Sequence, residues 1–121
     1  MAKILVVDDE QDSREMVQQA LGEEHEVFTV ENWVHIADYI FKHDIDLILM
    51  DVNMPGLKGD KLTEILMKQS KTKKPLNIVL FSALDEAELK EKVKEVNAKG
   101  YILKTFDKNL LRLRIGRFLR E

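Results

Sequence analysis

The 121-residue chain is predicted to fold as a single α/β domain with a doubly wound, five-stranded parallel sheet and helices on both faces. Three observations predict this. Short runs rich in Val, Ile, Leu and Phe alternate with longer stretches of helical periodicity. Three of these runs are apolar throughout, as buried strands are. Polar side chains follow the ends of the runs. The length suits one domain, so residues 1–121 are assigned to it.

The expected strands are short and bounded by polar residues. They are Ile4–Val7, Glu26–Val30, Leu47–Met50, Ile78–Phe81 and Tyr101–Leu103. Between and after them, apolar residues recur three or four positions apart, which indicates amphipathic helices. These sets are Met16 and Ala20; Ile36 with Ile40 and Ala37 with Phe41; Leu62, Ile65 and Leu66; Leu89, Val93 and Val96; and Leu111, Ile115 and Phe118.

Helix boundaries are indicated at three places. Asp85 followed by Glu88 has the spacing of a capping box, which would open the fourth helix. Gly22 and Gly100 stand where helices are expected to stop.

The order of the strands follows from their polarity. The first, third and fourth runs are apolar throughout and should be central, whereas the second mixes polar with apolar residues and the fifth is short. Edge positions for the second and fifth strands give the order 2-1-3-4-5, the flavodoxin-like alternative among doubly wound sheets. The pattern alone is also compatible with other orders.

Composition excludes several classes of function. The net charge is −3, which argues against direct nucleic acid binding by this domain because phosphate backbones favour a strong positive excess. The chain has no cysteine, which excludes disulfides, thiolate chemistry and zinc–cysteine sites. No segment fits a signal peptide or a membrane span, so we expect a cytoplasmic protein without membrane contact.

Polar side chains follow four of the five expected strands. Asp8 and Asp9 end the first, Asp51 the third, Ser82 the fourth and Lys104 the fifth. Parallel strands end at one edge of the sheet, where ligands bind in doubly wound folds. Three carboxylates gathered there must either take up a proton or bind a cation. Hard oxygen ligands without His or Cys favour Mg²⁺, with Mn²⁺ as the alternative.

A cation site with spare water positions can also accept phosphate oxygens. Lys104 would then contribute a positive charge and Ser82 a hydroxyl donor. A carboxylate can act as the nucleophile and form an aspartyl phosphate, and Asp51 is the best candidate because it begins the loop Asp51–Gly56. Taken singly, each residue has an ordinary explanation as a helix cap, a turn former or a surface lysine. Their conjunction at four strand ends favours the functional interpretation.

These motifs resemble the receiver domain of two-component response regulators over essentially the whole chain. Four segments carry the resemblance: Ile4–Glu10 as the acidic opening, Leu47–Gly56 as the phosphorylation-site segment, Ser82-Ala83 as the hydroxyl position with its small neighbour, and Gly100–Lys104 as the segment that ends in lysine. Together, in order and at family-like spacing, they are highly specific.

The resemblance implies a role for each residue of the phosphorylation site. Asp51 would accept a phosphoryl group from a sensor histidine kinase or a phosphotransfer protein. Asp9 and Asp51 would bind Mg²⁺ through their carboxylates, Asp8 through a metal-bound water, and Asn53 through its backbone carbonyl.

The resemblance also implies a switch. Ser82 and Lys104 would hold the phosphoryl oxygens, and Tyr101 would be the aromatic switch residue that moves inward when Ser82 is drawn to the phosphate. The alternative for Tyr101 is an ordinary aromatic residue of an edge strand.

Two positions qualify the resemblance. The lysine is usually followed by a cis proline, but here by Thr105, and a cis bond at a non-proline residue costs about 3 kcal/mol. The direction in which Lys104 points is therefore an open question. Leu84 occupies a position that tunes phosphate loss in the family, and an apolar side chain there cannot orient an attacking water.

The resulting hypothesis is a phosphorylation-dependent signalling switch that catalyses only its own phosphorylation and dephosphorylation. Its output surface would be the fourth helix, fifth strand and fifth helix, which would control a partner protein or an output domain. The last helix carries Arg112, Arg114, Arg117 and Arg120. They form either a solvated face or, paired with the acidic stretch 85–95, a homodimer interface.

Two other classes of function remain as alternatives. A phosphoesterase or phosphomutase with an aspartyl nucleophile usually has a second aspartate two residues later, where this chain has Asn53, which cannot act as acid or base. A binding module that works without phosphorylation is disfavoured by the intact set of polar residues, although Thr105 weakly favours it.

Overall fold

The computed structural model describes residues 1–53, 61–63, 65–66 and 77–120. The elements follow one another as β1 (Lys3–Val7), α1 (Gln11–Leu21), β2 (Glu26–Val30), α2 (Ile36–His43), β3 (Leu47–Asp51), β4 (Ile78–Ser82), α4 (Glu86–Val96), β5 (Gly100–Leu103) and α5 (Lys108–Arg120). Residues 61–63 and 65–66 are also helical, as their spacing predicts. Residues 54–56, which end the loop expected after Asp51, lie outside the described residues.

The five strands form one parallel sheet in the order β2-β1-β3-β4-β5, which confirms the predicted topology. The side chains of β3 and β4 are buried throughout, whereas β2 and most of β5 are only partly buried. Apolar content therefore separated central from edge strands correctly.

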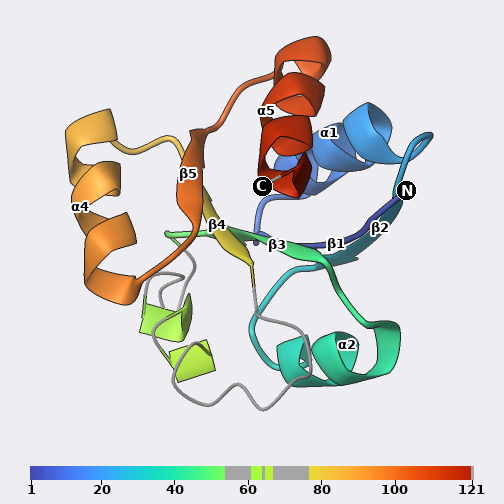
Figure 1. The fold of residues 1–121 in the computed structure, drawn as a ribbon, viewed down its shortest axis with the longest axis horizontal. Helices are drawn as coiled ribbons and strands as arrows, with labels where there is room; N and C mark the ends of the chain where they lie inside the picture. Colours follow the sequence, from blue (N-terminus) through green and yellow to red (C-terminus); the bar gives the residue numbers. More distant parts are fainter. Residues whose placement is uncertain (54–60, 64, 67–76, 121) are drawn as a thin grey trace.

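Alternate side chains of the strands enter two separate cores, one on each face of the sheet. Leu5, Val7, Ile48 and Met50 pack on one face against α2 and α4. Ile4, Val6, Leu47 and Leu49 pack on the other against α1 and α5. Figure 1 shows α1 and α5 together on one side of the sheet and α2 on the other. The result is a three-layer sandwich whose strands all end at one edge.

One predicted helix boundary is wrong, and one predicted cap lacks its hydrogen bond. Helix α4 ends at Val96, and its cap is Asn97 in the left-handed conformation (φ 60°), which asparagine tolerates. Gly100 instead begins β5. Asp85 does stand at the N-cap of α4, but its exposed side chain makes no capping hydrogen bond, which costs little where water is available. The stop predicted at Gly22 is confirmed, since α1 ends at Leu21.

Within the described ranges, no helix has both the length and the apolar character needed to cross a membrane.

Candidate functional site

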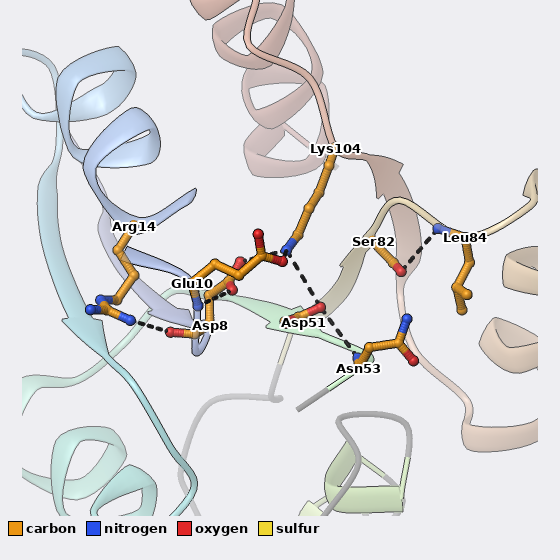
Figure 2. Close-up of polar contacts among 8 residues, drawn as sticks. All are labelled: Asp8, Glu10, Arg14, Asp51, Asn53, Ser82, Leu84 and Lys104. Atoms are coloured by element: carbon orange, nitrogen blue, oxygen red, sulfur yellow. Dashed lines mark hydrogen bonds and ion pairs between the residues drawn. The ribbon is translucent and has the colours of Figure 1, made fainter. Parts of the chain in front are cut away.

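The carboxyl ends of the strands bring the predicted polar side chains to one edge of the sheet (Figure 2). Asp8 and Asp51 are buried at 0% and 2% exposure, and Ser82, at the end of β4, is also buried. Asp9 is exposed, and Lys104 extends from the end of β5 toward the two buried aspartates. The sheet thus places two carboxyl groups in the interior, where either protonation or a nearby positive charge must offset their burial.

Lys104 supplies that charge. Its Nζ lies 3.0 Å from Asp8 Oδ2 and 3.6 Å from Asp51 Oδ1. It also lies 5.6 Å from the centre of the Phe81 ring, within the range of a cation–π contact. Lys104 therefore points into the site, which answers the question raised by Thr105.

The backbone around Lys104 explains this geometry. Every peptide bond of the described residues is trans, including Lys104–Thr105. The backbone N–H of Lys104 donates to the carbonyl of Ser82 (2.9 Å) and prolongs the β4–β5 pairing. The Thr105 hydroxyl accepts a hydrogen bond from the N–H of Asp107 (3.1 Å), which stabilises the following turn.

Three further hydrogen bonds orient the acidic groups. Asp8 Oδ1 accepts from the backbone N–H of Glu10 (3.0 Å), and Asp51 Oδ1 accepts from that of Asn53 (3.3 Å). The Arg14 guanidinium donates to the backbone carbonyl of Asp8 (2.8 Å). Each buried carboxylate therefore accepts a backbone hydrogen bond on its Oδ1.

The site holds more acidic groups than the positive charge of Lys104 can neutralise. Burial and the neighbouring Asp8 raise the pKa of Asp51 from 3.8 to about 7, although Lys104 and the Asn53 N–H lower it. For Lys104, burial alone would lower the pKa of the ammonium, but hydrogen bonds and charges from Asp8, Asp51 and Glu10 outweigh it and raise that pKa. One ammonium does not neutralise this group of carboxylates.

The donor set fits a divalent cation. One carboxylate oxygen each from Asp8, Asp9, Glu10 and Asp51 can be chosen so that all lie within 4.8 Å of one another. Asp51 Oδ2 is buried and has no hydrogen-bond partner among the described residues, and Asp8 Oδ2 has only the ion pair with Lys104. Mg²⁺ and Mn²⁺ bind carboxylate oxygens, and an oxygen without a hydrogen-bond partner is free to act as such a ligand.

Ser82 and Tyr101, the predicted switch residues, are both engaged in local hydrogen bonds. Ser82 Oγ accepts from the backbone N–H of Leu84 (3.2 Å), as Figure 2 shows. The Tyr101 hydroxyl donates to Glu86 Oε1 in the first turn of α4 (2.6 Å), and this bond raises the pKa of the phenol. In this structure, therefore, Tyr101 is tied to α4.

Tyr101 also lines a cavity of about 350 Å³ between α4, β5 and α5. Glu86, Arg114, Arg117 and Phe118 line it as well. Arg112 lies elsewhere: its Nε donates to the carbonyl of Ala20 at the end of α1 (2.6 Å). The predicted arginine face is therefore divided, since Arg112 anchors α5 to α1 while Arg114 and Arg117 face the cavity.

Three residues of the site were not predicted: Glu10, Arg14 and Glu86. Glu10 directly follows the aspartate pair, and its position in the acidic opening was the available signal. Arg14 acts on a backbone carbonyl and Glu86 on a phenol across 15 positions, and no local motif predicts such contacts.

Comparisons with known proteins agree with this geometry. The family model of the response regulator receiver domain matches residues 4–116. The chain belongs to the response regulator receiver family. Two-component signal transduction is therefore the process in which it acts.

Relatives of this receiver come as single domains and as parts of longer proteins. It is 27% identical over 118 residues to sporulation initiation phosphotransferase F of Bacillus subtilis, covering 97% of this chain and 93% of that protein. It is 35% identical over 119 residues to the phosphate regulon transcriptional regulatory protein PhoB of Pseudomonas aeruginosa, covering 98% of this chain but only 52% of that protein. It superimposes on chemotaxis protein CheY4 of Vibrio cholerae with a TM-score of 0.86 at 31% identity, covering 98% of both chains.

Proposed function

We propose that this receiver accepts a phosphoryl group on Asp51 from the histidine of a sensor kinase or phosphotransfer protein, and that it needs Mg²⁺ to do so. The observation that carries the proposal is the buried Asp51 carboxylate at the carboxyl edge of the sheet: Lys104 lies 3.6 Å from its Oδ1, and its Oδ2 has no hydrogen-bond partner among the described residues. An oxygen held in this way is a nucleophile without competing hydrogen bonds. Family membership supports the same assignment.

The reaction exchanges one phosphorus bond for another. A carboxylate oxygen of Asp51 attacks the phosphorus, the phosphorus–nitrogen bond of the donor breaks, and an acyl phosphate forms. Lys104, 3.6 Å from Asp51 Oδ1, is placed to balance the charge of the transferred oxygens.

The carboxylates of Asp9 and Asp51, the Asp8 carboxylate through water, and the Asn53 carbonyl would hold Mg²⁺. When bound, Mg²⁺ supplies positive charge that neutralises the phosphoryl oxygens. A nearby cation also favours the ionised form of Asp51, whose pKa of about 7 otherwise leaves the nucleophile partly protonated at neutral pH.

The consequence of phosphorylation is a change of surface rather than turnover of a substrate. The Ser82 hydroxyl would leave the Leu84 N–H for a phosphoryl oxygen, and Tyr101 would leave Glu86 and move inward. The surface of α4, β5 and α5 would then bind a downstream protein or an output domain. The apolar side chain of Leu84 offers no group that could orient a hydrolytic water, which favours slow loss of the phosphate.

We extend the proposal to self-association. Arg114 and Arg117 line the cavity of the α4–β5–α5 surface, and α4 begins with Glu86 and Glu88 in its first turn. Opposite charges on adjacent elements of one surface suit pairing with a second copy. A cytoplasmic location, expected from the sequence, stays a prediction.

The test is phosphoryl uptake measured by intact-mass spectrometry after incubation with Mg²⁺ and acetyl phosphate. Wild type should gain one phosphoryl group, whereas Asp51→Ala, or wild type with a chelator, should gain none. Gain by both proteins would assign the chemistry to another residue. No gain by wild type with acetyl phosphate, phosphoramidate or a phosphorylated histidine kinase would favour a module that signals without phosphate.

A further inference from the structure

The third partner of Lys104 is Glu10, whose carboxylate belongs to the acidic group of the site but has no assigned role in the proposed reaction. Lys104 Nζ lies 3.2 Å from Glu10 Oε1, a distance shorter than that to Asp51 (3.6 Å). Figure 2 shows the Glu10 side chain turned back over the site toward the ammonium. Glu10 is 63% exposed, whereas Lys104 is 14% exposed, so the glutamate covers the ammonium from the solvent side.

We infer that Glu10 is a positioning residue that holds Lys104 on the Asp8 side of the site and thereby slows phosphorylation of Asp51. This inference rests on the proposed function. An ammonium has three donors, and in this structure they are shared among Asp8, Glu10 and Asp51. Because Nζ lies closer to Asp8 and Glu10 than to Asp51, these two contacts oppose a move of the ammonium toward a phosphoryl oxygen at Asp51.

The two competing contacts differ in how readily they can be lost. Asp8 is fully buried, and leaving its carboxylate without a cation is costly. Glu10 is mostly exposed and can be solvated when Lys104 leaves. The Glu10 contact is therefore the adjustable one, and its charge also repels an incoming phosphate.

The backbone of Glu10 makes hydrogen bonds that a substitution of its side chain does not remove. Its N–H donates to Asp8 Oδ1, and its carbonyl accepts from the N–H of Arg14 (3.2 Å). A change in the Glu10 side chain therefore tests the carboxylate without removing these bonds.

The experiment compares four proteins: wild type, Glu10→Gln, Glu10→Asp and Glu15→Gln. Glu15 is the matched control, because it is an exposed glutamate on α1, the helix that Glu10 precedes, and its carboxylate accepts from Gln11 Nε2 instead of contacting Lys104. The readout is the rate of phosphoryl gain from acetyl phosphate, with phosphoramidate as a second donor, at saturating Mg²⁺ in 0.1 M and 0.5 M NaCl. Unfolding by urea is measured in parallel.

Glu10→Gln should be phosphorylated about two- to fivefold faster than wild type, the range for a partly exposed ion pair. Most of the gain should persist in 0.5 M NaCl, since a contact over a nearly buried ammonium is weakly screened. Glu10→Asp, with the same charge on a shorter side chain, should lie between the two. Glu15→Gln should match wild type, and the urea midpoints of all four proteins should agree.

Several outcomes would overturn the inference. A rate for Glu10→Gln equal to or below that of wild type would do so directly. A gain shared by Glu15→Gln, or abolished by salt, would show a general charge effect instead. If wild type is phosphorylated and one of these results is found, only the role of Glu10 is wrong. If wild type takes up no phosphoryl group from either donor, the proposed function is overturned together with this inference.

Discussion

Asp51 carries a cost to folding that its chemistry explains. Its carboxyl group is 2% exposed and lies near a second buried carboxylate, and its pKa rises to about 7. A folded-state pKa above the unfolded value means that the native state binds more protons between about pH 4 and pH 7. Stability is therefore greatest below this window and falls as the pH rises through it. The same ionised group is the nucleophile that the proposed reaction needs.

Replacement of Asp51 by Asn should reveal this cost. In chelator, Asp51→Asn should raise the free energy of unfolding at pH 8 by about 2 to 4 kcal/mol relative to wild type, because three pKa units correspond to roughly that range. At pH 4 the difference should nearly vanish, since wild-type Asp51 is then protonated in the folded protein. Urea unfolding followed by the fluorescence of the single tryptophan, Trp33, measures both values. A difference that does not vary with pH would contradict the assignment.

Replacement of Lys104 should change stability in the opposite direction to replacement of Asp51. Lys104→Met leaves Asp8 and Asp51 without their cation, so at pH 8 in chelator the free energy of unfolding should fall by about 3 kcal/mol. The loss should shrink at pH 5, where Asp51, whose pKa is about 7, is protonated and needs no cation. Lys90→Met, at an exposed position of α4, is the matched control and should change stability by less than about 0.5 kcal/mol. Equal effects of the two substitutions would contradict the central place of Lys104.

The candidate residues could be found from the sequence because they directly follow strands. Asp8, Asp9, Asp51, Ser82 and Lys104 each stand at a strand end, and a parallel sheet brings such ends together. Their roles in phosphorylation stay predictions. Glu10 and Glu86 could not be assigned in the same way, because their partners depend on how side chains bend after the fold has formed.

At the scale of elements, apolar runs predicted every strand to within one residue, and their polarity predicted the order of the sheet. Helix ends were less predictable. Gly100 was interpreted as a helix stop, but the glycine is needed for packing: a Cβ there would lie 2.5 Å from Cε1 of Phe118 on α5. Contacts between elements distant in sequence leave no local signal of this kind.

Substitutions of two glycines by alanine should therefore have different effects on the stability of the protein. Gly100→Ala should destabilise the protein by about 1 to 3 kcal/mol, because the added methyl overpacks the contact between β5 and α5. Gly116→Ala, within α5, should be neutral or stabilising by up to about 1 kcal/mol, since alanine favours the helix and its Cβ would meet only the end of the Arg120 side chain at 3.2 Å.

Thermal unfolding of both variants, together with Gly100→Ala/Phe118→Leu, checks this explanation. The smaller side chain at position 118 should recover part of the loss caused by Gly100→Ala. No recovery would show that the backbone of β5, rather than the Phe118 ring, requires glycine.

The candidate phosphorylation site and the proposed output surface lie in different parts of the molecule. Asp51 and Lys104 lie at the carboxyl edge of the sheet, whereas Arg114, Arg117 and Glu86 surround a cavity between α4, β5 and α5. Tyr101 belongs to β5, the strand that Lys104 follows, and its hydroxyl donates to Glu86 at the start of α4. Under the proposed function, β5 is the element through which a phosphoryl group on Asp51 would change that surface.

If that surface pairs with a second copy, sedimentation velocity should show a monomer without a phosphoryl mimic and a dimer with Mg²⁺ and beryllofluoride. Arg117→Glu should weaken the dimer by placing like charges together, and 0.5 M NaCl should weaken it too. Arg112→Gln, whose wild-type side chain anchors α5 to α1, tests general loss of structure instead. A monomer under both conditions would contradict the dimer while leaving phosphorylation untouched.

The most direct test of the central claim locates the phosphoryl group. An acyl phosphate on aspartate is reduced by borohydride to homoserine, which peptide mass spectrometry assigns to a position. After incubation with acetyl phosphate and Mg²⁺, we predict homoserine at position 51 alone, and none when a chelator is present. Homoserine at position 8 or 9, or a phosphate that borohydride does not remove, would contradict the claim that Asp51 is the phosphoacceptor.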